Sequence, residues 1–383
     1  MLRLLTAGES HGPGLTTIVE GLPSGLPVSR EGLAAELARR RLGYGRGRRM
    51  QLEQDEIEFL GGLRFGMTLG SPVSVLVRNT EFATKWTEEM NPEAGASSRP
   101  ATAPRPGHAD LAGMQKYDTH DARDILERAS ARETAARAVA GYLAKQLLHQ
   151  VGIDVFSHVV AIGDAAATGP RPTPEDLPTI DASPVRSSDP ASESAMVAAI
   201  EAAKADRDTL GGIVEVLAYG LPVGVGSHVH YDRRLDALLA MGLMSIQAIK
   251  GVEVGDGFDS ARRRGSAAHD EIAYSEGEFV RDTDRAGGIE GGMTNGQVVR
   301  VRAAMKPIST LMKALKTVDV ETKDEKSAIR ERSDVCAVPA AGVVAESMVA
   351  IVLAQEMQRK FGGDTISDFV AAVDAYRKRI ATF

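Results

Sequence analysis

The feature that most constrains this fold is a helix that the sequence predicts to begin at Ser130. Ser130 and Glu133 have the S-x-x-E spacing of a capping box, in which each side chain satisfies a free backbone N–H at a helix start. The apolar residues that follow recur at helical spacing and mark one buried face: Ala136, Val139, Ala140, Leu143 and Leu147. A helix with such a face must be covered by other elements, so this segment is expected in the core.

The segments around that helix indicate short strands and further helices in irregular order. Strands are predicted near residues 1–6, 15–20, 52–60, 68–77, 153–163, 213–219 and 298–304. Helices are predicted after Ser29, from Pro190, over residues 233–249 and from Pro339 to Gly362. Because strands and helices do not alternate regularly, the order favours an α+β fold over a doubly wound sheet. The glycine-rich run 287–296 lacks the G-x-G-x-x-G spacing of a dinucleotide-binding fold.

Composition sets the class of protein. With 383 residues, 43% of them hydrophobic and 25% charged, the chain can bury the core of one elaborated domain or of two to three ordinary ones. A single cysteine, Cys336, excludes an intramolecular disulfide and is expected to be a packed thiol. The first apolar run is too short for a secretory segment, and no stretch is expected to approach the length needed to cross a bilayer. A cytoplasmic location is therefore expected.

The segment 39–49, RRRLGYGRGRR, holds six arginines and three glycines. Arginine stays charged and matches phosphate and carboxylate geometry, so one interpretation is a flexible cationic clamp over a small polyanion. A second is a solvated basic turn after a helix, whose C-terminus favours cations. A third is nucleic-acid binding, which a net charge of −7 and the lack of a wider basic stripe do not favour.

Two histidines follow glycine-rich turns. His11 lies in the turn 8–12 between two predicted strands, next to Ser10, and is expected to be an exposed acid, base or anion contact. The G-x-S-x-G elbow of a serine hydrolase is absent. His108 follows Arg105, Pro106 and Gly107. With Asp110, His120, Asp121 and Asp124 it could suggest a metal site, but the spacing fits no zinc signature.

Three further segments could receive an anion. Arg128 and Arg132 flank the predicted helix start at Ser130, where free N–H groups favour negative charge, although two surface arginines on a core helix remain an alternative. The turn 306–310, KPIST, is cationic and rich in hydroxyls. Arg332 and Asp334 lie just before the helix expected from Pro339.

Eight ordered motifs together resemble the chorismate synthase family over residues 1 to about 362. They are GESHGPG (8–14), RRRLGYGRGRR (39–49), RPGHAD (105–110), LERASARETAARAVAG (126–141), QAIKGVEVGDGF (247–258), GGIEGGMTNGQ (287–297), MKPIST (305–310) and RSDVCAVPAAGVVAE (332–346). The chain departs from the family at 118–120, where Asp-Thr-His replaces the more usual Gly-Phe-Asp. The resemblance implies one domain over 1–383, with variable loops near 88–107 and 164–192.

The resemblance implies a fold and a reaction. The fold is a β-α-β sandwich, with antiparallel sheets enclosing a helical layer, assembled as a homotetramer. The reaction is the last shikimate-pathway step: a 1,4-trans elimination of phosphate from 5-enolpyruvylshikimate 3-phosphate to chorismate, which requires reduced FMN (FMNH2) without net redox change. The implied partner is that small molecule, with no nucleic acid and no membrane.

The resemblance also implies site residues. His11, assisted by Ser10, would protonate or stabilise the departing phosphate; His108 would keep reduced FMN correctly protonated near N1; Asp334 would serve the proton balance at N5. Implied FMN contacts are Arg128, Ala129, Ser130, Gln247, Ala248, Gly291, Lys306, Pro307, Ile308, Ser309, Thr310 and Arg332. Substrate or a nicotinamide nucleotide would meet Arg40, Arg46, Arg49, Arg105 and Arg132.

Alternatives from other classes stay open at this point. A metal-dependent phosphohydrolase would use the His and Asp groups and lose activity with a chelator. An RNA-binding module would use residues 39–49 and show steep salt dependence. The absence of a nucleotide-binding signature favours an enzyme that does not reduce its own flavin with NADPH.

Overall fold

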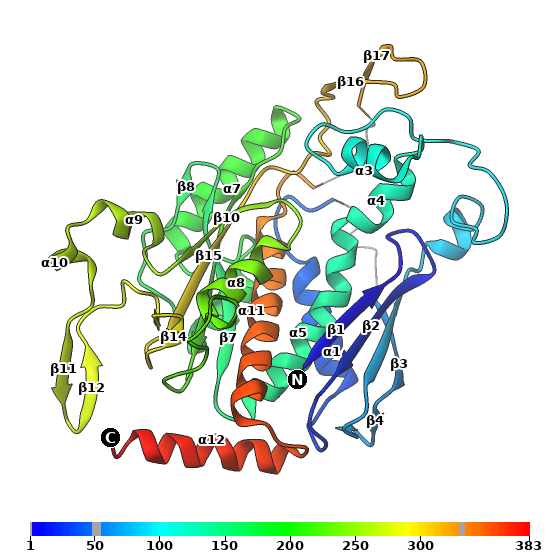
Figure 1. Cartoon of the computed structure of the whole chain (residues 1–383). Coiled ribbons are helices and arrows are strands. Elements are labelled where there is room, and N and C mark those ends of the chain that lie inside the picture. The colour runs from blue at the N-terminus through cyan, green and yellow to red at the C-terminus, as the bar shows by residue number, and fades with distance from the viewer. Residues whose placement is uncertain (1, 48–54, 329–333) are drawn as a thin grey trace.

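A computed structural model describes residues 2–47, 55–328 and 334–383 (Figure 1). The chain is a mixed α+β protein, as the irregular order of elements predicts. Its first large sheet has the order β1-β2-β6-β3. These strands span Arg3–Ala7, Gly14–Glu20, Val73–Arg78 and Glu56–Gly61. Val73, Val75 and Val77 alternate along β6 and are fully buried, so one face of this sheet is covered.

The second large sheet has the order β10-β15-β9-β7-β8. Its strands span Ile249–Val254, Val299–Met305, Gly212–Tyr219, Asp154–Ile162 and Ala165–Ala166. Smaller hairpins pair β4 (Leu63–Arg64) with β5 (Met67–Thr68), β11 (Ile272–Ser275) with β12 (Glu278–Arg281), β13 (Ile289–Glu290) with β14 (Met293–Thr294), and β16 (Lys316–Val318) with β17 (Glu325–Ser327). Every pairing between strands in the described residues is antiparallel, which differs from a doubly wound parallel sheet.

Three helices pack together beside these sheets (Figure 1). α5 (Thr134–His149) contacts β2 of the first sheet, α11 (Val338–Phe361) contacts β7 and β9 of the second, and α1 (Arg30–Arg41) contacts both helices. α5 and α11 approach closely at Gly141, where an added Cβ would lie 2.3 Å from Cβ of Ser347. A side chain at position 141 would therefore push the two core helices apart.

The remaining helices lie around this framework. They are α3 (Asp110–Tyr117), α4 (Arg123–Ala129), α6 (Leu177–Ala182), α7 (Pro190–Ala205), α8 (Leu235–Met244), α9 (Gly257–Arg262), α10 (Gly265–Ala268) and α12 (Ile366–Ile380). Single turns of other helix types span Phe82–Trp86, Ala131–Glu133, Pro174–Asp176 and Tyr231–Arg233. The predicted loop 88–107 is confirmed as irregular. The second predicted loop, 164–192, is irregular only in part, because it contains β8, the turn Pro174–Asp176, α6 and the start of α7.

Most predicted elements are confirmed, with local corrections. Ser130 does cap a helical start, because its Oγ accepts from the N–H of Arg132. The reciprocal half of the capping box does not form: Glu133 instead accepts from Thr6, Arg137 and Gln247. α8 ends at Met244 rather than at residue 249, since Ala248 has a φ of +66° and the chain turns there into β10. α4 was not predicted, and residues 52–54 of a predicted strand lie outside the described residues.

One helix corrects the expectation about membranes. α11 is long and apolar enough to cross a membrane, since an 18-residue window has a mean hydropathy of 1.7. Inside the protein, however, 89% of that window is buried. Its apolar surface is covered by α5, β7 and β9, so α11 is the core helix of this fold.

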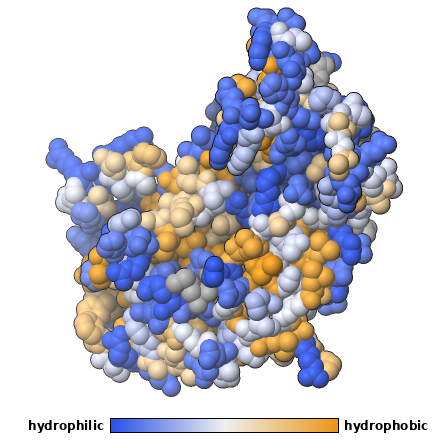
Figure 2. Space-filling view, turned by 45° about the vertical axis from the view of Figure 1, so that its right-hand side comes forward, coloured by the Kyte–Doolittle hydropathy of each residue, from blue (hydrophilic) through white to orange (hydrophobic). Residues whose placement is uncertain are grey.

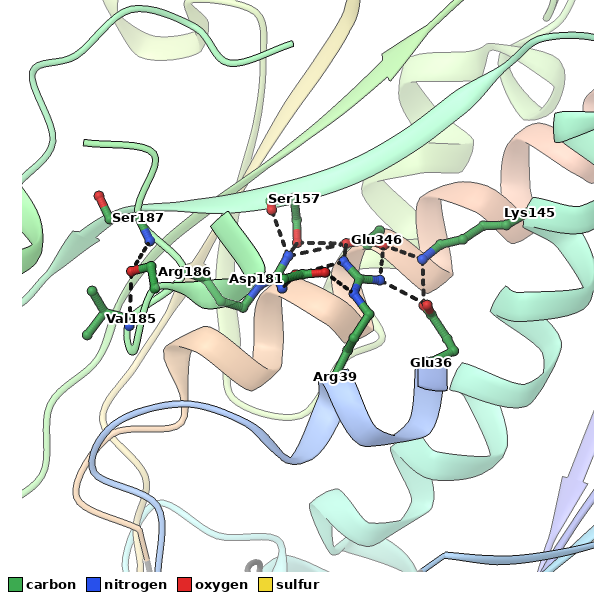
Figure 3. Close-up of polar contacts among 10 residues, drawn as sticks. Glu36, Arg39, Lys145, Ser157, Asp181, Val185, Arg186, Ser187 and Glu346 are labelled. Atoms are coloured by element: carbon green, nitrogen blue, oxygen red, sulfur yellow. Dashed lines mark hydrogen bonds and ion pairs between the residues drawn. The ribbon is translucent and has the colours of Figure 1, made fainter. Parts of the chain in front are cut away.

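A buried ion network joins α1, α5, α6 and α11 (Figure 3). Glu346 of α11 accepts from Arg39 at 2.7 Å and from Ser157 at 3.0 Å, and it also pairs with Lys145. Arg39 further contacts Glu36 at 2.9 Å and Asp181 at 2.8 Å. Burial would raise the pKa of Glu346, but the surrounding cations hold it below its usual range. The network thereby fixes the last turn of α1, from which the segment 39–49 begins.

Candidate active site

His11 lies in the turn between β1 and β2 and is held by one carboxylate. Its backbone N–H donates to Oε2 of Glu127 at 2.8 Å, and its Nδ1 lies 2.8 Å from Oε1 of the same residue. The N–H of Ser10 donates to the carbonyl of Glu127 at 3.0 Å. His11 is only 8% exposed, so the expectation of an exposed histidine is wrong. The ring of Trp86 covers it, with centroids 3.9 Å apart.

The carboxylate of Glu127 is an ionised hydrogen-bond acceptor. Burial would raise its pKa, but the hydrogen bond and charge of His11 and the charge of Arg123 outweigh burial and hold the pKa below the usual value. Arg123 donates to Oε1 of Glu127 at 3.0 Å, and its guanidinium lies 5.0 Å from the centroid of the Trp86 ring. An ionised carboxylate cannot donate, so Nδ1 of His11 carries the proton that joins the pair.

The two arginines that flank Ser130 tie the same turn to α4 and to the short turn before α5. Arg128 donates to the carbonyls of Gly8 at 2.9 Å and Thr6 at 3.0 Å. Arg132 donates to Oδ1 of Asn79 at 3.0 Å, while the amide of Asn79 donates to the carbonyl of Gly12 at 2.7 Å. Hydrogen bonds from Arg128, and from Arg132 through Asn79, therefore hold the backbone of the turn that carries His11.

Carboxylates hold the described part of the basic segment, residues 39–47. The carboxylate oxygens of Asp55 lie 2.5 Å from a guanidinium nitrogen of Arg132, 3.5 Å from one of Arg41 and 3.9 Å from one of Arg40. Arg40 is 3% exposed, so the interpretation of a solvated basic turn is wrong for this residue. Arg46 pairs with Asp334 at 2.6 Å, and the N–H of Gly47 donates to the same carboxylate at 2.7 Å. Two residues with separate expected roles, Arg46 and Asp334, are thus brought together.

His108 is held by a second buried carboxylate. Its Nδ1 contacts Oδ1 of Asp110, which begins α3 and is fully buried. Arg105 donates to Asp110 through its backbone N–H at 3.0 Å and through its guanidinium at 2.8 and 3.1 Å. Burial would raise the pKa of Asp110, but the hydrogen bonds from His108 and Arg105 hold it well below its usual range.

The expected flavin contacts fall into connected groups. Lys306 donates to the carbonyl of Gly107 at 2.7 Å, beside His108, and its backbone N–H donates to Ala248 at 3.0 Å. Gln247 donates to Glu133 at 3.3 Å, and its Oε1 is buried without a hydrogen-bond partner among the described residues. Thr209 donates to the carbonyl of Ile308 at 2.9 Å.

Leu210 follows Thr209 in the chain, and its N–H donates to the carbonyl of Val335 at 2.9 Å. The turn that contains Ile308 therefore lies near Asp334, the residue before Val335. Pro307, Ser309 and Thr310 belong to the same turn. Gly291 is not joined to these residues by any described contact: it lies in the turn between β13 and β14, which is bonded to residues 226 and 227. Arg49 and Arg332 lie outside the described residues.

Sequence reasoning missed Glu127, Trp86, Asn79 and Asp55. Glu127 stands inside the motif LERASARE, but its partner His11 is 116 positions away, so no local pattern could pair them. Asp55 and Asn79 likewise act on arginines that are distant in sequence. Trp86 carries the one indole of the chain, and nothing in its neighbourhood indicates that it stacks on a histidine.

The metal alternative gains no support from the arrangement of acidic groups. Among the described residues there is no group of three or more His, Cys, Asp or Glu side chains that could hold a metal ion. His120 pairs with Glu321 at 2.5 Å, and both side chains are exposed. A cavity of about 790 Å³ lies under residues 88–98, but Glu9, Glu88, Glu89, Glu93, Asp121, Asp124 and Glu127 line it, so it does not suit an anion.

Cys336 is confirmed as a packed thiol. It is fully buried, and burial raises its pKa to about 11. Its thiolate is therefore scarce at neutral pH, which makes it a poor nucleophile.

The comparisons with known proteins agree with the motifs. The family model for chorismate synthase matches residues 2–358. Chorismate synthase of Parafrankia sp. (strain EAN1pec) is 62% identical over 393 residues and covers 100% of both chains. The enzyme of that name from Acidothermus cellulolyticus is 61% identical, with 98% of each chain covered. A crystal structure of a chorismate synthase superposes with a TM-score of 0.81 at 40% identity, over 100% of this chain and 99% of the other. The chain therefore belongs to the chorismate synthase family and is a carbon–oxygen lyase that acts on phosphate.

Proposed function

We propose that this protein eliminates phosphate from 5-enolpyruvylshikimate 3-phosphate to give chorismate, a 1,4-trans elimination that requires reduced FMN and has no net redox change. The observation that carries the proposal is the pair of histidines, His11 and His108. Each is held at Nδ1 by a buried carboxylate that also binds an arginine. Together with family membership, this arrangement suits a substrate with two carboxylates and a phosphate.

His11 has the chemistry to assist departure of the phosphate. Because Nδ1 donates to Glu127, exchange of a proton with a substrate falls to Nε2. Ser10, bonded through its backbone to Glu127, places a hydroxyl group next to that histidine. General acid catalysis of this kind contributes roughly 10²–10⁴ in rate. Removing the proton donor should therefore slow the chemical step far more than it weakens binding.

The arginines would supply the charge that binds the substrate. Arg40, Arg46, Arg105 and Arg132 are held by Asp55, Asp334 and Asp110, so their guanidinium groups are oriented before a ligand arrives. Pre-oriented donors cost less reorganisation when an anion binds. Arg49, in the same basic segment, is expected to act with them.

The residues present fit reduced FMN, which when bound would supply electron density to the reacting carbon framework. Gln247 offers a buried side-chain oxygen that has no hydrogen-bond donor among the described residues. An N–H group of the flavin ring could donate to it. Lys306, Ser309 and Thr310 offer a cation and hydroxyl groups. Arg128 and Ala129 lie at the end of α4, and Ser130 caps the short turn that leads into α5. His108 would hold a proton near flavin N1, and Asp334 would accept or return one near N5. Ala248, Gly291, Pro307, Ile308 and Arg332 complete the proposed contacts.

The proposal includes the assembly and the surroundings of the enzyme. A β-α-β sandwich is supported by the contacts of α5 and α11 with the two large sheets. A homotetramer is supported by apolar side chains on the first sheet, where Leu5 and Ile18 are cross-strand partners and are 65% and 37% exposed. Figure 2 shows that hydrophobic side chains gather on the lower part of one face, whereas the upper projection is mainly hydrophilic. We also place the enzyme in the cytoplasm, without nucleic acid or membrane as partner, and with NADPH only as a possible source of electrons for the flavin.

The test is an anaerobic assay of the purified protein. It combines 5-enolpyruvylshikimate 3-phosphate with and without dithionite-reduced FMN, and follows chorismate absorbance and phosphate release together. Equal amounts of both products, formed only with reduced FMN, are expected. Phosphate without chorismate and independent of flavin would contradict the proposal and indicate a phosphohydrolase, which a chelator would then identify as metal-dependent or not.

A further inference from the structure

We propose that Glu127 is a positioning residue that fixes the tautomer and the ring orientation of His11. This inference rests on the proposed function for its consequence in turnover, but its geometric part can be tested without substrate or flavin. Glu127 belongs to α4, whereas His11 belongs to the β1–β2 turn, so the pair joins two separate parts of the chain.

One carboxylate holds His11 at two points. Oε2 accepts the backbone N–H and Oε1 accepts Nδ1–H, each at 2.8 Å. A backbone contact and a ring contact to one rigid group leave the ring little freedom about its two side-chain torsions. The proton therefore stays on Nδ1, and Nε2 is directed to one place.

The surroundings keep this carboxylate ionised and in place. Glu127 is 3% exposed, and Arg123 of the same helix donates to it at 3.0 Å. Arg123 also lies over the Trp86 ring, which in turn lies against the His11 ring. His11 is thus held at its edge by Glu127 and at its face by Trp86, and Arg123 contacts both of these groups.

Glutamine at position 127 distinguishes positioning from bulk. The amide has one oxygen and one NH2 group, so it cannot accept from both N–H groups of His11. With its oxygen on the backbone N–H, its NH2 group would donate to Nδ1, and the ring proton would move to Nε2. Glu127→Gln thus changes the tautomer of His11 at nearly constant volume.

The chain offers a matched control in a second buried pair of the same chemistry. Nε2 of His158 lies 3.0 Å from Glu215, in the second sheet, and among the described residues no hydrogen bond or ion pair joins this pair to the proposed site. Glu215→Gln breaks a His–carboxylate pair of similar burial, so it reports the effect of losing such a pair anywhere in the fold.

The experiment uses flavin-free, full-length protein with ¹⁵N-labelled histidine rings, and identifies the His11 signals with His11→Asn. In the wild type and in Glu215→Gln, Nδ1 of His11 is expected to carry the proton. In Glu127→Gln the proton is expected on Nε2, and the emission of the one tryptophan, Trp86, should change because the ring beside it moves. With substrate and reduced FMN, kcat of Glu127→Gln should fall about 10²-fold at nearly unchanged KM.

Glu127→Asp provides the second variant, because it keeps two acceptor oxygens on a shorter stem. It should retain the Nδ1–H tautomer and recover turnover to within about tenfold of wild type. An Nδ1–H tautomer in Glu127→Gln, or wild-type turnover with the altered tautomer, would overturn the inference. A wild-type protein that forms no chorismate would instead refute the proposed function, while the tautomer result would still decide whether Glu127 positions His11.

Discussion

The two histidines of the proposed site are held in the same way but from different distances along the chain. Nδ1 of His11 meets Glu127, which lies 116 positions away, whereas Nδ1 of His108 meets Asp110, two positions away. Consecutive helices supply the carboxylates: Asp110 is the first residue of α3 and Glu127 lies in the last turn of α4. The side chains of His11 and His108 are 9% and 18% exposed. The contact of His11 with its carboxylate thus depends on the tertiary fold, whereas the contact of His108 forms between residues of one short motif.

The cations beside the two carboxylates differ as well. Asp110 is fully buried and receives three hydrogen bonds from Arg105. Glu127 accepts a hydrogen bond from Arg123 at 3.0 Å, and the side chain of Arg123 is 16% exposed. The Asp110 pair is therefore the more rigid and the more costly to break, while the Glu127 pair is the more dependent on correct packing of α4 against the β1–β2 turn.

The largest expected effect concerns His11 itself. His11→Ala should lower kcat by about 10²–10⁴, because the proposed proton donor to the departing phosphate is lost. Thermal unfolding monitored by circular dichroism should show a folded variant, since a turn residue is removed and the core is unchanged. Turnover within twofold of wild type would remove His11 from the proposed chemistry.

The next prediction compares how much Asp110 and Glu127 each contribute to the free energy of unfolding. Asp110→Asn should lower the free energy of unfolding by about 3–5 kcal/mol, because it removes the ionised carboxylate that accepts three hydrogen bonds from the buried Arg105. Glu127→Gln should cost less, about 1–3 kcal/mol, because Arg123 can turn towards solvent. Urea unfolding of both variants at neutral pH measures the difference. Equal losses would show that the two pairs are not distinguished by burial.

A pH titration of stability sharpens the same contrast. The pKa of Asp110 is held below its ordinary value of 3.8, so its contribution is fully present above that pH and is lost as the pH falls below it. The wild-type free energy of unfolding should therefore decline as the pH is lowered through this range. Asp110→Asn should show a shallower decline when urea unfolding is repeated at several acidic pH values. Parallel curves for the two proteins would contradict the assigned cause.

The smallest effect is expected at a third histidine, His120, in the turn 118–120. His120 pairs with Glu321, but the two side chains are 63% and 54% exposed. Exposed pairs of this kind contribute little, no more than about 1 kcal/mol. His120→Ala should leave turnover and flavin affinity unchanged in the anaerobic assay. A loss of turnover above tenfold would place the 118–120 turn in the site.

The sequence could predict what is local. The cap at Ser130, the apolar face of α5 and the alternation of β6 depend on neighbours within one or two helical turns or along one strand, and all three are confirmed. The motif RPGHAD likewise places Asp110 beside His108. These features are visible because spacing alone determines which side chains share a face.

The sequence could not predict which charges meet across the fold. The pattern of the basic segment 39–49 allows a clamp, a solvated turn or a nucleic-acid contact, yet Arg39 meets Glu346 and Arg46 meets Asp334. Glu133, expected in a capping box, is drawn instead to Arg137 and Thr6. Buried charges select partners by three-dimensional proximity, so their pairing depends on the packing of α1, α5 and α11 rather than on any local pattern.

The most direct test of the central claim compares His11→Ala and His108→Ala in one anaerobic experiment. Binding of reduced FMN is measured by titration, and phosphate release is then followed in a single turnover with 5-enolpyruvylshikimate 3-phosphate. We predict that His11→Ala binds reduced FMN like the wild type but releases phosphate at least 10²-fold more slowly. His108→Ala should in contrast bind reduced FMN more weakly. Unchanged phosphate release by His11→Ala, or unchanged flavin affinity of His108→Ala, would contradict the division of roles between the two histidines.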